Sequence, residues 1–228
     1  MLKLIPILFL FSAALHAGEN LIKNGSLNEG EEMPLHWEKA DGLISFYMKE
    51  KGRGRIIKLD TAVARSQALA WAKTLLKDPK AKAPKPKYLS AGSYATIGAV
   101  EGVMLDSDYI KAKPGQNYKL TADFKGDGTP FIWIKGFRWH PKRKGFIDAY
   151  QTRLAPESPS KTKWKTFSIG FNPTKRTPYV LKFKVRVYAY WPSGKYYFDN
   201  IRVEEIDQKE MDELVKKRGV VKEKKKSQ

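Results

Sequence analysis

Apolar and polar residues alternate with a period of two through much of the second half of the chain. In 181–191 the odd positions are apolar, whereas the even positions carry Lys, Arg or Tyr. In 118–124 the even positions are apolar and the odd ones are polar. Because successive side chains of a strand point to opposite faces, each segment predicts a strand with one face in a core and one face outward.

Turn-forming Gly, Pro, Asn and Asp residues separate these segments, as in Lys113–Gln116 and Pro192–Gly194. Many strands joined by such turns favour an antiparallel sandwich or barrel. The predicted strands are 43–48, 55–59, 93–104, 107–112, 117–125, 130–139, 145–154, 164–171, 179–191 and 196–205.

The segment 131–139 differs because both of its faces are apolar. A strand of this kind is either central and covered on both sides, or it shows aromatic rings to a ligand. The rings that would share one face are Phe131, Trp133, Phe137 and Trp139.

Helical spacing appears in two places. Apolar residues recur with a helical period over 64–77, and Pro79 ends the pattern. The helix and the Pro- and Lys-rich stretch behind it form a predicted insertion over 62–92. A short helix is predicted over 207–219, within a basic tail that spans 207–228.

Residues 1–17 are typical of a secretory signal peptide: Lys3, an apolar run and then small residues up to Ala17. The run is too short for a membrane span, which needs about 20 residues, and no later stretch is apolar enough. We therefore expect export to the exterior, the periplasm or the cell envelope, with no transmembrane segment.

Charge narrows the choice of partner. The chain of 228 residues has 43 Lys and Arg and 24 Asp and Glu, a net charge of +19. Most of that excess, +15, lies between residues 18 and 206. Such a field attracts polyanions, and export favours an acidic polysaccharide over nucleic acid. No recognised nucleic-acid motif is present.

Three segments together resemble carbohydrate-binding modules of the family 4/9 type, which have a galactose-binding-like jelly roll. They are Asn20–Leu27 with Trp37 downstream, Lys113–Gly126, and Trp164–Phe167 followed by Tyr197–Val203. Their order and spacing agree over roughly residues 20–206. The resemblance implies an opening strand at 20–22 and an all-β fold: a two-sheet antiparallel jelly-roll β-sandwich over 18–206. The helical insertion and the short C-terminal helix and tail are additions to it.

The resemblance also implies a structural calcium ion that joins the opening loop to the closing strand. The matching positions are Asn28, with Glu29 next to it, and Asp199. The family usually has an acid where this chain has Asn28. Calcium prefers several oxygen ligands, among them charged carboxylates.

Two groups of residues are candidate ligand contacts. Tyr188 and Tyr190 lie on the outward face of their strand beside Arg186, which would place ring faces next to a cation that binds acidic groups. The alternative is that the insertion helix covers them. A second set consists of Arg138, Trp139 and Tyr150, near predicted loops, with a core position for Trp139 as the alternative.

Catalytic signatures are weak. The chain has no Cys and three His, so disulfides, a Cys nucleophile and a multi-His metal site are excluded or disfavoured. The carboxylate pairs Asp106/Asp108 and Asp123/Asp127 are explained as turn residues. We expect a non-enzymatic protein that binds an anionic extracellular or envelope polysaccharide. The alternatives are a structural or adhesion module with a protein partner, and a glycan-active enzyme or its accessory subunit.

Overall fold

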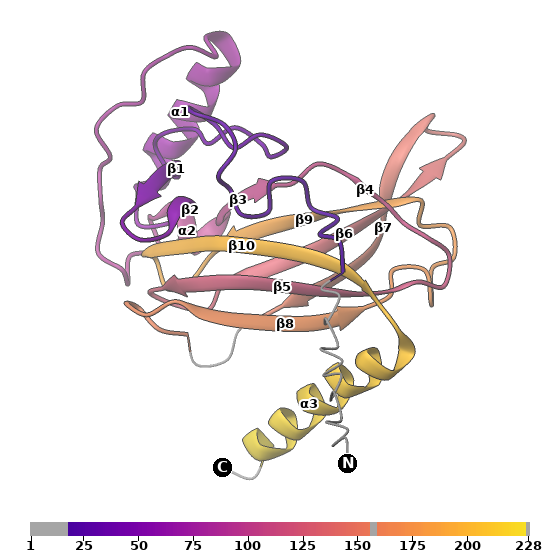
Figure 1. Cartoon of the computed structure of the whole chain (residues 1–228). Coiled ribbons are helices and arrows are strands. Elements are labelled where there is room, and N and C mark those ends of the chain that lie inside the picture. The colour runs from indigo at the N-terminus through magenta and orange to yellow at the C-terminus, as the bar shows by residue number, and fades with distance from the viewer. Residues whose placement is uncertain (1–17, 156–158, 227–228) are drawn as a thin grey trace, which may run out of the picture.

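The computed structural model describes residues 18–155 and 159–226; the predicted signal peptide lies outside this part. Two antiparallel five-stranded sheets pack face to face as a jelly-roll β-sandwich (Figure 1), which confirms the predicted fold class. The first sheet has the order β1 (Ser45–Glu50), β2 (Gly54–Asp60), β10 (Lys195–Ile206), β5 (Asn117–Gly126), β8 (Lys165–Phe171). The second has the order β3 (Val103–Asp106), β9 (Lys182–Ala189), β6 (Phe131–His140), β7 (Gly145–Leu154), and β4 (Ile110–Lys111) also pairs with β9.

The core lies between the two sheets. The strands alternate as predicted: Tyr118, Leu120, Ala122 and Phe124 of β5 are fully buried, and so are Phe183, Val185, Val187 and Ala189 of β9. Inward side chains of the two sheets meet directly, as in the edge-to-face contact between Tyr118 and Phe183. The burial of these apolar side chains is the main stabilising contribution to the sandwich.

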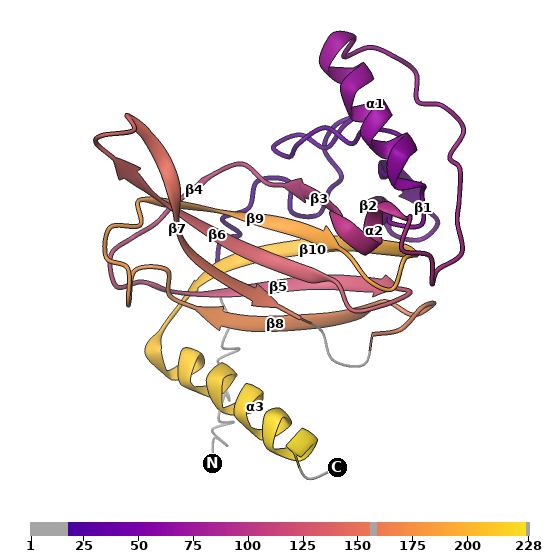
Figure 2. The ribbon, with the colours of Figure 1, turned by 180° about the vertical axis from the view of Figure 1, so that it is seen from behind.

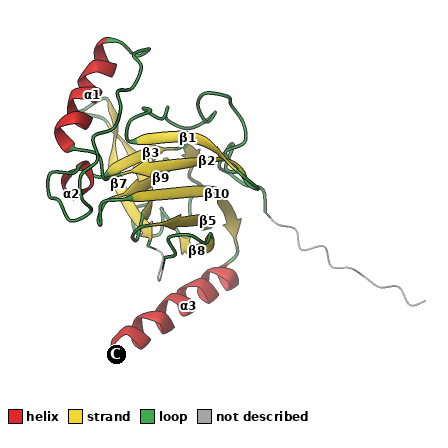
Figure 3. Cartoon of the chain, turned by 90° about the vertical axis from the view of Figure 1, so that its left-hand side faces the viewer, coloured by secondary structure: helices red, strands yellow, loops and turns green. Residues whose placement is uncertain are grey.

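The helices lie at the margins of the sandwich. Helix α1 (Arg65–Lys77) and the short α2 (Ile97–Val100) lie beside the end formed by β1, β2 and β3 (Figures 1 and 3). Helix α3 (Gln208–Lys226) packs outside β8 and β5. Seen from behind, β6, β7 and β9 lie in front and no helix crosses them (Figure 2). No helix of the described part therefore covers the outer face of the second sheet.

The predicted strand 93–104 is wrong in its first part, which forms a turn and helix α2 before β3 begins. Gly98 packs so closely against Thr61 and the Tyr190 carbonyl that a Cβ atom would clash with both, and its N–H donates to the Thr61 carbonyl. Gly102 then adopts a left-handed conformation, with φ +72°. These tertiary constraints override the apolar pattern, which by itself suits a strand.

The opening segment is also not a strand. Residues 20–27 form turns, with left-handed φ values at Asn24 and Leu27. Leu21 N–H donates to the Val203 carbonyl, and the Asn20 side chain binds the backbone of β10. Side-chain hydrogen bonds of Asn thus replace the ladder that the resemblance implied. No helix in the described part is both long and apolar enough to cross a bilayer.

Candidate functional site

The outer face of the second sheet carries a lattice of rings and cations. Cross-strand register sets its rows: Tyr188 lies opposite Phe131, Arg186 opposite Trp133, and Lys184 opposite Lys135. Arg153 of β7 continues the row of Trp133. We call this surface, formed by the outward side chains of β9, β6 and β7, the sheet face. It brings together residues that lie more than 50 positions apart in the sequence.

A shallow pocket of about 390 Å³ lies at one end of the sheet face. Four of its nine lining residues are aromatic and four are polar or charged, a combination common in ligand-binding sites. The lining residues are Glu101, Met104, Phe131, Trp133, Lys135, Gln151, Arg186, Tyr188 and Tyr190.

Three rings of this pocket stand in a parallel series. The ring planes of Phe131 and Tyr188 lie within 10° and those of Tyr188 and Tyr190 within 13°, with 6.3 Å between centroids in each pair. The Tyr188 hydroxyl donates to the Glu101 carbonyl at 3.1 Å. Burial raises the pKa of Tyr188, so the hydroxyl stays neutral at physiological pH. The Arg153 guanidinium lies over Phe131, 4.2 Å from the ring centroid.

A buried carboxylate orients the cations in the middle of the face. Arg186 donates to both oxygens of Asp106, at 2.6 and 2.9 Å, and Lys184 contacts the same carboxylate. Asp106 is only 2% exposed. Burial raises the pKa of Asp106, but the hydrogen bonds from Arg186 and Lys184 outweigh burial, so the net pKa lies below its ordinary value. Two cations share one anion, so Asp106, Arg186 and Lys184 together keep a net positive charge.

The opposite end of the sheet face holds an ammonium group between rings. Lys182 Nζ lies 3.7 Å from the ring centroids of both Tyr109 and Phe146, and Trp139 packs edge-on against Phe146. The three rings are each nearly half exposed. Among the described side chains no carboxylate pairs with Lys182. Its charge is therefore held in place by ring faces and left free for a ligand.

The structure joins some of the predicted contacts and separates others. Arg186, Tyr188 and Tyr190 line one pocket, and no residue of the insertion helix α1 is among its lining residues. Trp139 lies at the opposite end of the same face. Arg138 alternates with it and points to the other side of β6, and Tyr150 packs against the core. The set Arg138, Trp139 and Tyr150 is thus not brought together.

Sequence reasoning did not assign Phe131, Trp133, Arg153 or Lys182 to the site. The alternation did place Phe131 and Trp133 on one face of their strand, but it did not show whether that face was covered. Their neighbours are set by the pairing of β6 with β9 and β7, which local sequence does not encode.

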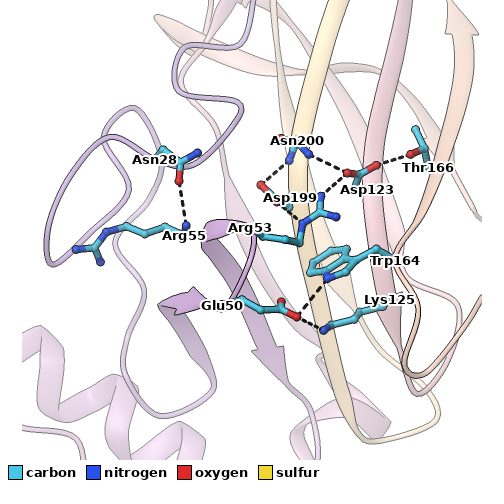
Figure 4. A network of polar contacts seen from close by, with 10 residues as sticks. All are labelled: Asn28, Glu50, Arg53, Arg55, Asp123, Lys125, Trp164, Thr166, Asp199 and Asn200. Carbon is cyan, nitrogen blue, oxygen red and sulfur yellow. Dashed lines mark hydrogen bonds and ion pairs between the residues drawn. The ribbon is translucent and has the colours of Figure 1, made fainter.

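Two of the three residues matched to calcium, Asn28 and Asp199, have protein partners instead (Figure 4). Asp199 accepts from the Arg53 Nε at 2.7 Å and from the Asn200 N–H, and the Asn28 side-chain oxygen accepts from the Arg55 N–H at 3.0 Å. Glu29 is exposed. The described residues contain no group of three or more His, Cys, Asp or Glu suited to a metal ion. These contacts do not fit a calcium site built from Asn28, Glu29 and Asp199. Calcium binding remains a prediction, and the observed contacts argue against it at these residues.

Next to Asp199, where the resemblance implied calcium, the structure has the guanidinium of Arg53. Its guanidinium contacts both Asp199 and Asp123 and lies 4.2 Å from the centroid of the Trp164 ring. Burial raises the pKa of Asp199, and Arg53 offsets this only in part. The pKa of Asp123 is lowered, because hydrogen bonds from Thr166, Asn200 and Arg53 outweigh its burial. One guanidinium thus neutralises part of the charge of two buried acids.

The carboxylate pairs noted in the sequence are engaged elsewhere. Asp106 binds Arg186 and Lys184, whereas Asp108 binds His36 Nδ1 at 2.9 Å. Asp123 binds Arg53, and Asp127 accepts from the Lys195 N–H. Each acid has its own partner in the described structure.

No known protein family and no curated protein sequence matches this chain. Solved structures similar to it include the enzymatically active domain of bacteriophage CBA120 tailspike protein 4, at 10% identity and a TM-score of 0.51, over 82% of this chain and 21% of that one. A family 16 carbohydrate-binding module has 14% identity and a TM-score of 0.44, over 81% and 99% of the two chains. TmCBM61, solved in complex with β-1,4-galactotriose, has 12% identity and a TM-score of 0.44, over 82% and 99%. The chain spans about a fifth of the tailspike chain, and at these identities the similarity concerns the fold alone.

Proposed function

We propose that this protein binds an anionic polysaccharide on the sheet face and does not act on it as an enzyme. The observation that carries the proposal is the series of parallel rings Phe131, Tyr188 and Tyr190 along one surface pocket, beside Trp133 and the guanidinium groups of Arg153 and Arg186.

Sugar rings present flat C–H faces, which stack on aromatic rings, and their hydroxyl groups need fixed donors and acceptors nearby. The pocket supplies both, because Gln151, Lys135 and Arg186 lie beside the rings. The rings need little ordering on binding, since strands hold their backbones and the Tyr188 hydroxyl is already bound.

Charge supports an acidic ligand. Five cations project from the sheet face, and three of them pair with carboxylates there: Lys135 with Asp148, and Lys184 and Arg186 with Asp106. The five cations are Lys135, Arg153, Lys182, Lys184 and Arg186. A third carboxylate, Glu101, lines the pocket and pairs with Arg65. Uronate and sulfate groups accept charge-assisted hydrogen bonds from such side chains. Carbohydrate-binding modules among the similar structures, and the resemblance to the family 4/9 type, agree with a glycan ligand.

The predicted export of the chain agrees with an extracellular or envelope ligand. The apolar segment 1–17 would direct the chain to the exterior, the periplasm or the cell envelope, where acidic polysaccharides occur. A protein partner on the same face is the competing proposal, and the exposed cluster of Tyr109, Trp139 and Phe146 is the observation that favours it.

Affinity electrophoresis of residues 18–228 tests the proposal. Native gels would contain polygalacturonate, chondroitin sulfate, xylan or galactan, at low and at high salt. We expect retardation by one or two acidic polymers, weakened but not abolished by salt. Trp133→Ala and Lys182→Gln should each reduce it about tenfold, a loss of about 1.4 kcal/mol in binding. Lys73→Gln on the exposed side of α1 removes the same charge away from the sheet face and serves as the control.

Equal retardation by every polyanion, unaffected by Trp133→Ala, would show that charge alone acts. Retardation by neutral xylan without salt dependence would contradict the anionic ligand. If no polymer retards the protein and gel filtration shows a dimer that Trp139→Ala dissociates, the sheet face is a protein interface and the proposal fails.

A further inference from the structure

A second pair of exposed rings lies on the loops beside the pocket. The rings of Tyr94 and Trp191 are parallel within 8°, with centroids 5.7 Å apart. Tyr94 is 82% exposed, and Trp191 is more than one-third exposed. Trp191 directly follows Tyr190, which lines the sheet-face pocket. The pair thus follows the pocket directly in the chain, one residue beyond Tyr190.

Buried hydrogen bonds fix the two loops to each other. Thr96 and Ser193, both buried, share a hydroxyl–hydroxyl hydrogen bond of 2.5 Å. Thr61 binds the backbone of Gly194, with its hydroxyl accepting from the Gly194 N–H at 2.9 Å. The ring pair is therefore presented by loops that are held together before any ligand arrives, which lowers the entropy cost of binding.

The two loop segments that carry the pair are themselves uncharged. Residues 88–100 contain no Lys, Arg, Asp or Glu, although the chain as a whole carries a net charge of +19, and the same holds for 191–194. Ser90 and Ser93 lie in the same loop as Tyr94 and carry hydroxyl groups. A flat, exposed ring in an uncharged loop with hydroxyl-bearing residues suits a neutral pyranose ring.

We infer that Tyr94 and Trp191 form a second subsite, which stacks on one uncharged sugar ring of the same polysaccharide. The inference rests on the proposed function and extends it: the ligand alternates between acidic units, held by the sheet face, and at least one neutral unit, held by the loops. A contact made by stacking between uncharged groups is not screened by salt, whereas contacts to Lys182 and Lys184 are.

The test compares Tyr94→Ala and Trp191→Ala with Trp133→Ala of the pocket and with Tyr179→Ala. Tyr179 is 70% exposed on another loop, so its variant removes an exposed tyrosine without touching the pair. The readout is the dissociation constant for the polymer that retards the wild type, at low and at high salt. We expect Tyr94→Ala and Trp191→Ala to weaken binding about fivefold to tenfold by the same factor at both salt concentrations, and Tyr179→Ala to leave it unchanged.

If Tyr94→Ala and Trp191→Ala bind like the wild type while Trp133→Ala is weakened, the second subsite is refuted and the proposed function stands. If the loop variants are weakened and Trp133→Ala is not, the inference holds and the sheet face is refuted as the site. If the loss in the loop variants shrinks at high salt, the subsite is not a neutral one. If no polymer binds the wild type, both proposals fail. Unchanged unfolding midpoints show that an observed loss is not a folding defect.

Discussion

At the scale of single residues, the centre of the sheet face depends on a carboxylate that lies in the interior. Asp106 is bound by Arg186 and Lys184 and has a lowered pKa. It sets the direction of two cations that we assign to ligand binding. A buried ion pair is costly to break, because removal of one partner leaves the other charge without compensation.

Asp106→Asn should therefore destabilise the protein by about 3 kcal/mol at neutral pH. A carboxyl group with a depressed folded-state pKa adds stability above its unfolded pKa of about 3.9 and loses it as the pH falls through the folded pKa. The difference in unfolding free energy between wild type and variant should thus be constant above about pH 5 and shrink below pH 3.9. Urea unfolding from pH 2.5 to 7 measures it.

Asp148→Asn is the matched control, because Asp148 is mostly exposed and pairs with Lys135 at 2.9 Å on the same face. An exposed pair contributes about 0–1 kcal/mol, so this variant should stay close to the wild type. Equal effects of the two substitutions would contradict the special position of Asp106.

At the scale of elements, helix α1 is held by a small cluster of its own. Trp71 is buried against Leu43 and Val63, and its indole N–H donates to the Asp41 carbonyl at 2.9 Å. The periodicity of 64–77 predicted an apolar side for this helix; Ala68 and Trp71 are buried on it, whereas Leu69 and Leu76 of the same pattern are exposed. The structure shows that the side docks next to β1, away from the sheet face.

Trp71→Ala should cost about 3 kcal/mol, because it removes a large buried side chain and one hydrogen bond. Leu76 lies on the same helix but is 86% exposed, so Leu76→Ala should change the free energy of unfolding by less than about 0.5 kcal/mol. Thermal unfolding compares the two, and amide exchange reports on residues 65–77. Binding of the polysaccharide should survive in both variants at a temperature where they are folded; its loss in Trp71→Ala alone would mean that α1 supports the site.

At the scale of the whole molecule, positive charge is spread over the body and the C-terminal tail. Helix α3 packs Met211 and Leu214 over Gly170 of β8, on the side of the sandwich away from the sheet face. Helix α3 is therefore an addition to the outside of the sandwich. The core between the two sheets does not depend on it.

Deletion of 207–228 should leave the sandwich folded, with the circular dichroism of a β protein and a cooperative transition. The deletion removes eight bases and five acids, so retention on an anionic envelope surface should fall, most clearly at low salt. Retention is measured by fractionation of cells or of vesicles with acidic polymers. Unchanged retention would refute this role of the tail, and loss of the cooperative transition would show that α3 belongs to the folding unit.

The sequence by itself determined the class of the fold. Alternation in β5 and β9 identified their buried faces, and the spacing of apolar residues located α1, because both patterns arise from the local geometry of strands and helices. The same alternation placed Arg186, Tyr188 and Tyr190 outward, where the structure has them.

Only the tertiary structure decided which outward residues act together. Phe131 and Tyr188 became neighbours through the register of β6 and β9. Tyr150 and Trp139 were separated, because Tyr150 lies on the inward side of β7 with Leu154 whereas Trp139 lies on the outer face of β6. Tertiary contacts also turned 97–100 into a helix and gave Asp199 an arginine as its partner. Register and long-range packing depend on residues far apart in the chain, so no local pattern carries them.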